Sequence, residues 1–218
     1  MCGRFININK LSKLKKFFEI NVNPSFNYSQ SYNIAPSQNS LAISLENDFK
    51  FKNFNWGIDF FDKINNKVVK IINSRIETIN NKIIFKESFF KKRCIIPTNG
   101  YYEWLNKNGK KLPFFIHIAN LNTFFFAGIW KESINENNKL NNFSIITKNA
   151  NKSICSIHNR MPIILSYNEA INYLENQYSY KELSSHSELE NDIEYYQVSK
   201  IVNYPKNNSK LCIQKNNY

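Results

Sequence analysis

Cys2, directly after Met1, is the residue with the most reactive chemistry in this chain. Methionine aminopeptidases remove Met before a small residue, which would leave Cys2 with a free α-amine beside its thiol. Such an amine titrates at about 7.7 to 8.0 and a thiol at about 8.5, so both are partly nucleophilic at neutral pH. The thiol can attack an amide with the amine as base, or the amine can condense with an aldehyde while the thiol closes a thiazolidine ring. Cys2 alone leaves both reactions open.

Several motifs of fixed internal spacing accompany this cysteine. They are MCGRF (1–5), YNIAP (32–36), WG (56–57), NSRIET (73–78), RCIIPTNGYYEW (93–104), PFF (113–115), AGIW (127–130), IHNRMP (157–162) and a terminal segment, 198–203. In this order they closely resemble the SRAP family, the SOS response-associated peptidases or abasic site processing proteins, over nearly the whole chain. Tyr101 stands where Phe is common in the family, a change that we expect to matter little.

The resemblance implies four active-site residues. Cys2 resembles the nucleophile that crosslinks to an abasic site in single-stranded DNA, its amine forming an imine with the sugar aldehyde and its thiol closing a thiazolidine. Glu103 resembles the general acid/base for imine formation and reversal, and partial burial beside Trp104 would raise its pKa toward neutrality. His158 resembles the group that assists sugar ring opening. Asn73 resembles the group that orients the sugar or the Cys2 amine.

The resemblance also implies DNA contacts. Arg75 and Arg160, each two residues after a proposed active-site residue, match arginines that grip phosphates around the lesion, and Arg4 is a third candidate, because guanidinium groups bind phosphate oxygens bidentately. Trp56 either stacks on a flanking base or packs in the core. A single strand suits the reaction, because unstacking a nucleotide from a duplex costs a few kcal/mol.

These residues predict an enzyme with SRAP-type thiol autopeptidase and abasic-site crosslinking activity, of the hydrolase or lyase kind. Removal of Met1 is either autocatalytic or the work of an aminopeptidase. Two other functions stay open. An N-terminal nucleophile amidase or glutamine amidotransferase also begins with Met-Cys-Gly, and a non-covalent reader of single-stranded DNA would need Arg75 and Arg160 but not Cys2.

Composition and charge limit the class of protein. Of 218 residues, 42% are hydrophobic, and the formal net charge is +12, which favours an anionic partner such as nucleic acid. We expect a soluble intracellular protein, in the cytoplasm or nucleoid if bacterial, without membrane contact, and a monomer. The four cysteines are widely spread, so we expect free thiols. Cys155 and His158 have zinc-like spacing, but no second pair completes a site, so we expect no metal and no small-molecule cofactor.

The pattern of apolar residues predicts one strand-rich α+β domain spanning residues 1–218, with an open, barrel-like antiparallel or mixed sheet and a few flanking helices. Leu11, Leu14, Phe17 and Phe18 have helical spacing, and a second helix follows a capping box at Ser166 and ends near residue 177. Apolar runs predict strands at 41–45, 68–72, 94–96, 114–118, 124–129, 143–147 and 163–165. We expect an exposed hairpin loop at 135–142, and a polar surface excursion at 179–192.

Overall fold

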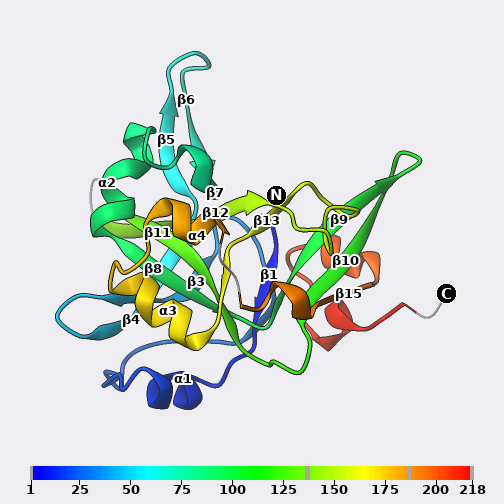
Figure 1. The fold of residues 1–218 in the computed structure, drawn as a ribbon, viewed down its shortest axis with the longest axis horizontal. Coiled ribbons are helices and arrows are strands. Elements are labelled where there is room, and N and C mark those ends of the chain that lie inside the picture. Colours follow the sequence, from blue (N-terminus) through cyan, green and yellow to red (C-terminus); the bar gives the residue numbers. More distant parts are fainter. Residues whose placement is uncertain (1, 136–137, 186–187, 217–218) are drawn as a thin grey trace.

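The computed structural model describes residues 2–135, 138–185 and 188–216. Strands dominate it, in two main sheets and a projecting hairpin (Figure 1). The predicted strand-rich α+β fold with a barrel-like sheet and few helices is confirmed. The amino-terminal segment runs up between the two sheets, so its first residues lie in the middle of the molecule (Figure 1).

The first sheet is antiparallel. Its strand order is β15 (Ile193–Gln197), β10 (Lys110–Ile118), β9 (Gly100–Lys107), β1 (Phe5–Asn7) and β2 (Ser31–Ile34). Gly100 permits the close packing at the start of β9, since a Cβ atom there would lie 2.3 Å from the Phe115 ring and 2.8 Å from the Ile116 carbonyl oxygen. The order of strands fixes β1, and with it the segment just after Cys2, between β9 and β2.

The second sheet curls into a partial ring. Its strands in order are β13 (Arg160–Pro162), β12 (Asn138–Asn149), β4 (Phe49–Trp56), β3 (Asn39–Leu45), β8 (Arg93–Thr98), β11 (Phe124–Asn135) and β14 (Ile164–Leu165). The ring forms because β11 also pairs with β12. The short strand β7 (Asn73–Arg75) joins β12 in parallel, which places Asn73 beside Ile145 and Arg75 beside Thr147.

Helices and one hairpin complete the fold. They are α1 (Leu11–Phe17), α2 (Ile83–Lys91), α3 (Tyr167–Leu174), α4 (Tyr180–Ser185) and the hairpin of β5 (Ile58–Asp62) with β6 (Lys67–Ile71). In Figure 1 this hairpin projects at the top of the molecule and the β9–β10 hairpin projects at the upper right. Asn73 lies on β7 and Glu103 on β9, while Cys2 and His158 lie just before β1 and β13.

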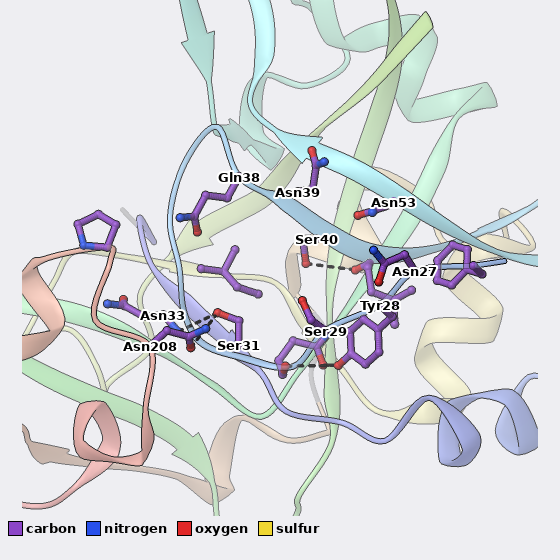
Figure 2. A pocket seen from close by; sticks show the side chains of 15 residues that line it. Asn27, Tyr28, Ser29, Ser31, Asn33, Gln38, Asn39, Ser40, Asn53 and Asn208 are labelled. Carbon is purple, nitrogen blue, oxygen red and sulfur yellow. Dashed lines mark hydrogen bonds between the residues drawn. The ribbon is translucent and has the colours of Figure 1, made fainter.

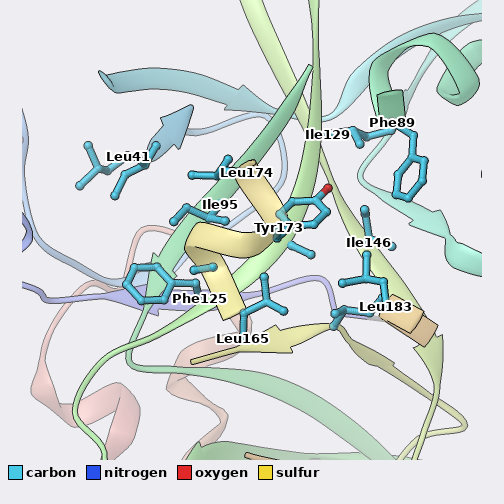
Figure 3. Close-up of a cluster of buried hydrophobic side chains, with 14 of the residues drawn as sticks. Leu41, Phe89, Ile95, Phe125, Ile129, Ile146, Leu165, Tyr173, Leu174 and Leu183 are labelled. Atoms are coloured by element: carbon cyan, nitrogen blue, oxygen red, sulfur yellow. The ribbon is translucent and has the colours of Figure 1, made fainter. Parts of the chain in front are cut away.

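Two apolar clusters lie on opposite faces of the ring strands. In the first, Tyr173 and Leu174 of α3 cover Ile95 of β8 and Phe125 of β11 (Figure 3). The second fills the space between the two sheets and includes Cys2. Alternation along each ring strand supplies both clusters, because successive side chains of a strand point to opposite faces. Ile95 therefore belongs to the first cluster and Ile96 to the second.

The predicted elements are found with shifted ends. Each predicted strand matches one in the structure, and both predicted helices form, with Ser166 accepting from the Glu169 amide and Glu169 accepting from the Ser166 amide as a capping box. Helix α2, which begins without a side-chain cap, was not predicted. The helix α4 lies in the polar region expected at 179–192, of which residues 186–187 lie outside the described chain.

The expected loop at residues 135–142 is wrong over most of its length. Strand β11 extends to Asn135 and β12 begins at Asn138, while residues 136–137 lie outside the described chain. The ladder from the pair Gly128 and Ile145 to the pair Asn135 and Asn138 is unbroken. The backbone hydrogen bonds of an antiparallel pair do not require apolar side chains, so an Asn-rich sequence can continue the strands.

Arg93 ties the helices to the ring. Its buried guanidinium donates to the carbonyl oxygens of Phe89 at 2.9 Å, Tyr173 at 3.0 Å and Tyr178 at 3.0 Å. It also lies against the rings of Phe89 and Tyr173, 4.5 Å and 4.9 Å from their centroids. Phe89 and Tyr173 lie in the last turns of α2 and α3, so one cation satisfies carbonyl groups at the ends of both helices.

Replacing Arg93 with Met should therefore lower the free energy of unfolding by about 2 to 4 kcal/mol, because buried carbonyl groups lose a charged donor. Denaturant unfolding of purified protein measures this. Arg75→Met is the matched control: Arg75 is exposed, and its loss should change stability by no more than about 0.5 kcal/mol. Equal stability of the two variants would contradict this account of Arg93.

Candidate active site

Cys2 lies buried in the cluster between the two sheets. Its backbone carbonyl oxygen accepts a hydrogen bond from Nδ2 of Asn73 at 2.8 Å. Further along, the Tyr102 amide donates to the carbonyl of Arg4 at 2.9 Å, which aligns the segment after Cys2 with β9. Burial, and then the negative charge of Glu103, raise the pKa of the Cys2 thiol. The Asn73 side chain thus holds the backbone of Cys2, and the Cys2 thiol lies away from water.

Asn73 is the first residue of β7 and pairs with Ile145 of β12. Its hydrogen bond to Cys2 joins positions 71 residues apart in the sequence. The side chain is buried, and its Oδ1 atom accepts no hydrogen bond from the residues that the structure describes. Because a buried carbonyl oxygen without a donor is unfavourable, this atom can receive an N–H or O–H group from a ligand.

Glu103 is a buried acid, 3% exposed, in strand β9. Burial raises its pKa to about 7, because a carboxylate is less well solvated there than in water. Its negative charge acts on the Cys2 thiol and raises the pKa of that thiol. A carboxyl group that titrates near neutrality can both donate and accept a proton under ordinary conditions.

His158 follows a turn at residues 152–157 and comes just before β13. The backbone amide of Arg160 donates to its Nδ1 atom at 2.9 Å. Nδ1 also lies 3.2 Å from the Arg160 carbonyl oxygen, but the amide contact is shorter and its N–H can only donate, so we assign the proton of the neutral ring to Nε2. Burial lowers the pKa of His158. The ring is therefore held as a neutral donor at Nε2.

One pocket brings Glu103 and His158 together. It is lined by Arg4, Glu103, Trp104, Lys111, His158 and Asn203. The four predicted active-site residues are thus linked in series: Asn73 to Cys2 by a hydrogen bond, Cys2 to Glu103 by charge, and Glu103 to His158 by a shared pocket. The sequence prediction did not include Lys111, whose exposed side chain on β10 adds a positive charge.

Arg4 and Trp104 line this pocket side by side. The Arg4 guanidinium lies 5.9 Å from the centroid of the Trp104 ring, and its Nη1 donates to Asn33 Oδ1 and to the Val202 carbonyl oxygen, both at 2.8 Å. The indole of Trp104 donates to Asn203 Oδ1 at 2.8 Å. Arg4 is therefore fixed in place, and Trp104, predicted to lie beside Glu103, is an aromatic surface in the pocket.

The three predicted arginines differ in their surroundings. Arg75 is exposed and makes no side-chain hydrogen bond or ion pair within the described residues. It lines a largely apolar groove with Asn73, Phe60 and Ile83, so it adjoins the active site. Its guanidinium can bind an anion without breaking a contact within the protein.

Arg160, by contrast, is buried and already paired. Its Nη1 and Nη2 atoms lie 2.6 Å and 3.0 Å from the two carboxylate oxygens of Glu77. Asn149 Oδ1 and the Thr147 carbonyl oxygen accept further hydrogen bonds, at 2.8 Å and 2.7 Å. In this geometry the guanidinium holds β12, β13 and the segment after β7 together, and its amide positions His158.

Trp56 lies in the core with 0% of its surface exposed. Its indole donates to the Ile72 carbonyl oxygen at 3.0 Å, and its ring packs on Phe5 at 5.0 Å and on Phe143 at 6.1 Å between centroids. Of the two alternatives for Trp56, the structure shows core packing. The expectation of base stacking is corrected, because no face of this ring reaches solvent.

Cys2, Cys94, Cys155 and Cys212 are all free cysteines. Cys155 is exposed, and its sulfur lies 3.5 Å from the Lys152 carbonyl oxygen. Within residues 2–135, 138–185 and 188–216, the His, Cys, Asp and Glu side chains form no group of three that could hold a metal ion. Over the same ranges no helix is long and apolar enough to cross a membrane.

A second pocket lies between β2, β3 and the segment that precedes β2 (Figure 2). Its lining is neutral and rich in amides, including Asn27, Asn33, Gln38, Asn53 and Asn208. None of the predicted site residues lines it, and it has no charged side chain. A phosphodiester strand therefore fits the pocket around Glu103 better than this one.

The chain is similar to known proteins over nearly its whole length. The family model described as SOS response associated peptidase (SRAP) matches residues 1–205. The abasic site processing protein YoqW of Bacillus subtilis is 36% identical over 222 residues, covering 98% of this chain and 99% of its own. The abasic site processing protein YedK of Escherichia coli is 28% identical over 225 residues, covering 98% of this chain and 99% of its own.

Solved structures share the fold. A protein from Bacteroides thetaiotaomicron superposes with a TM-score of 0.73 at 25% identity, over 85% of each chain. A phage-related protein from Bordetella bronchiseptica superposes with a TM-score of 0.72 at 21% identity, over 91% of this chain and 95% of its own.

The raised pKa of Glu103 predicts a pH-dependent stability. The unfolded pKa is about 4.3 and the folded pKa is about 7, so the native state binds the proton more tightly. The contribution of Glu103 is therefore most favourable below pH about 4 and is lost as the pH rises to about 7. Glu103→Gln should be more stable than the wild type at pH 8 by a few kcal/mol, a difference that shrinks toward pH 4.

Unfolding by denaturant at a series of pH values measures this difference. Glu87→Gln is the control, because Glu87 is an exposed carboxylate on α2. Its stability should follow the wild type at every pH. If the Glu103→Gln curve did the same, the carboxyl group would not be buried as described.

Proposed function

The chain belongs to the SOS response-associated peptidase family, and on that premise we propose that it processes abasic sites in DNA by bonding covalently to them through Cys2. One observation carries the proposal: Asn73 holds the backbone of Cys2 while a carboxyl group with a pKa of about 7 acts on its thiol. A nucleophile beside an acid that titrates near neutrality suits a reaction in which protons are both delivered and withdrawn.

The reaction has two bond-forming steps. Removal of Met1, by the protein itself or by an aminopeptidase, frees the amine of Cys2. The amine adds to the aldehyde carbon of the opened sugar, and loss of water gives an imine. The sulfur then adds to the same carbon as the thiol proton passes to the nitrogen, which closes a thiazolidine. The product holds one new C–N and one new C–S bond, and water is the sole leaving group.

Glu103 moves the protons. In its neutral form it protonates the hydroxyl that leaves as water, and the resulting carboxylate accepts the proton of the thiol. Burial keeps both forms populated near pH 7. The same transfers in reverse reopen the ring, so this residue also serves slow release of the crosslink.

His158 and Asn73 prepare the sugar. The Nε2 proton of neutral His158 is available to the ring oxygen of the closed sugar, which favours opening to the aldehyde. The buried Oδ1 of Asn73 can accept a hydrogen bond from the Cys2 amine or from a sugar hydroxyl. Both groups act as neutral hydrogen-bonding partners and leave the proton transfers to Glu103.

The DNA is held by cations around these residues. Arg75 on one side and Arg4 with Lys111 on the other are placed to bind phosphates, while Trp104 offers a face for a flanking base. A single strand is the proposed substrate, because the abasic sugar must leave any base stack to enter the pocket. The formal net charge of +12 attracts such a strand from a distance.

Incubation of the protein with single-stranded DNA bearing one abasic site should give an adduct that survives denaturation without any added reductant. Cys2→Ala should abolish the adduct, since the sulfur that closes the ring is lost and an imine to the remaining amine hydrolyses on denaturation. Cys155→Ala is the matched control, because Cys155 is an exposed thiol outside the pocket. Gel electrophoresis under denaturing conditions measures the product.

Other outcomes separate the alternatives. Hydrolysis of glutamine with no DNA adduct would identify an amidase. Binding that survives Cys2→Ala and weakens with salt, with no covalent product, would identify a non-covalent reader of DNA. Failure of the wild type to form any adduct would overturn the proposal.

Arg75→Met and Arg160→Met should separate binding from folding. Loss of Arg75 should weaken binding to single-stranded DNA and reduce the salt dependence by about one phosphate contact, with unfolding unchanged. Loss of Arg160 leaves Glu77 without its partner and should lower stability first. Salt titrations of binding, paired with thermal unfolding, distinguish the two; a reversed pattern would contradict these roles.

A further inference from the structure

Tyr101 places an unpaired hydroxyl in the apolar cluster that holds Cys2. The side chain is buried, and its Oη atom has no hydrogen-bond partner among the described residues. The next residue behaves differently: Tyr102 faces another cluster, and its Oη donates to the Tyr32 carbonyl oxygen at 2.8 Å. Buried hydroxyls are nearly always paired, so the lone one at Tyr101 requires an explanation.

The sheet directs Tyr101 to the active-site side of β9. Residues 101 and 103 of a strand point to the same face, so the phenol lies on the face that carries Glu103. Phe5 of β1 pairs with Tyr101, and the Arg4 carbonyl accepts from the Tyr102 amide. Cys2, three residues before Phe5, lies in the same buried cluster as Tyr101.

Three groups act electrically on the phenol. They are the Cys2 thiol from the segment before β1, Glu103 from the same strand, and Glu190 from the short 3-10 helix Glu190–Asp192. Lys148 of β12 pairs with Glu190 and partly offsets that charge. Burial, and then Cys2 as the largest of the three, raise the pKa of Tyr101. The phenol therefore keeps its proton at working pH and is available as a donor.

We propose that the Tyr101 hydroxyl is a positioning group that donates a hydrogen bond to the Cys2 sulfur once the thiol has lost its proton. This inference rests on the proposed crosslinking reaction. The thiol proton passes to the Glu103 carboxylate, the sulfur lone pair forms the C–S bond, and the electron pair of the C=N bond takes up a proton at nitrogen. Tyr101 keeps its own proton throughout and holds the sulfur against the imine carbon.

The hydroxyl of Tyr101 is also unusual for the motif in which it lies. Phenylalanine is common at this place in the motif, and the change to Tyr was expected to matter little. The ring packs against Phe126 as a phenylalanine would, with centroids 5.8 Å apart. The added oxygen, however, lies in the cluster of the nucleophile, so the change affects chemistry more than packing.

Tyr101→Phe tests the proposal, since it removes one oxygen and keeps the ring. The measurement is the pH dependence of Cys2 modification by methyl methanethiosulfonate, read by peptide mass, on protein lacking Met1, alongside the rate of adduct formation with abasic single-stranded DNA. Below the pKa of the thiol we expect the variant to react about tenfold more slowly in both assays, because a hydrogen bond to a charged group stabilises the thiolate. The profile of the variant should be displaced to higher pH relative to that of the wild type, and the unfolding midpoint should not fall.

Tyr102→Phe is the matched control. It removes the bond to the Tyr32 carbonyl, so the unfolding midpoint should fall while the pH profile of Cys2 stays that of the wild type. A Tyr101→Phe profile that superimposes on the wild type, or one that is slower at every pH with a lower midpoint, would overturn the proposal. Absence of any wild-type adduct, with the Tyr101→Phe shift in thiol reactivity intact, would instead refute the crosslinking reaction alone.

Discussion

The pairing of β1 with β9 is the interaction on which the site depends. It runs the amino-terminal segment antiparallel to the strand that carries Glu103, between two sheets whose side chains exclude water. That exclusion has two consequences. It raises the pKa of the carboxyl group to about 7, and it makes the Cys2 thiol reluctant to lose its proton unless a base is at hand. Burial between the sheets thus makes the Cys2 thiol depend on a base, and it gives Glu103 a pKa at which it can act as that base.

The remaining parts of the site come from the ring. Asn73 reaches Cys2 because β7 pairs with β12, and His158 reaches the pocket because the amide of Arg160, at the start of β13, fixes its ring. Both β7 and β13 pair with β12. Strand β12 therefore positions both Asn73 and His158. The ion pair of Arg160 with Glu77 links β13 to the segment after β7.

Local features of the sequence were sufficient to predict some helices and strands. The Ser166 capping box and the apolar runs gave helix α3 and the central strands, because both patterns act over a few residues. The surroundings of individual side chains depend on tertiary contacts, which the sequence pattern does not show. Nothing adjacent to Trp56 distinguishes it from Trp104, yet one is sealed in the core and the other lines the pocket. Arg160 resembles a phosphate ligand by position, but its partner Glu77 lies 83 residues away. The active-site residues themselves were found by family resemblance, since no short spacing joins Asn73 to Cys2.

The central claim is that both the amine and the sulfur of Cys2 bond to the sugar. It is tested most directly by digesting the adduct with abasic DNA and determining the mass of the crosslinked peptide. The account predicts a peptide that begins at Cys2, carries the sugar remnant with the loss of one water, and resists both acetylation of its amine and alkylation of its thiol. A crosslinked peptide that retains Met1, or one in which a lysine carries the sugar, would contradict it.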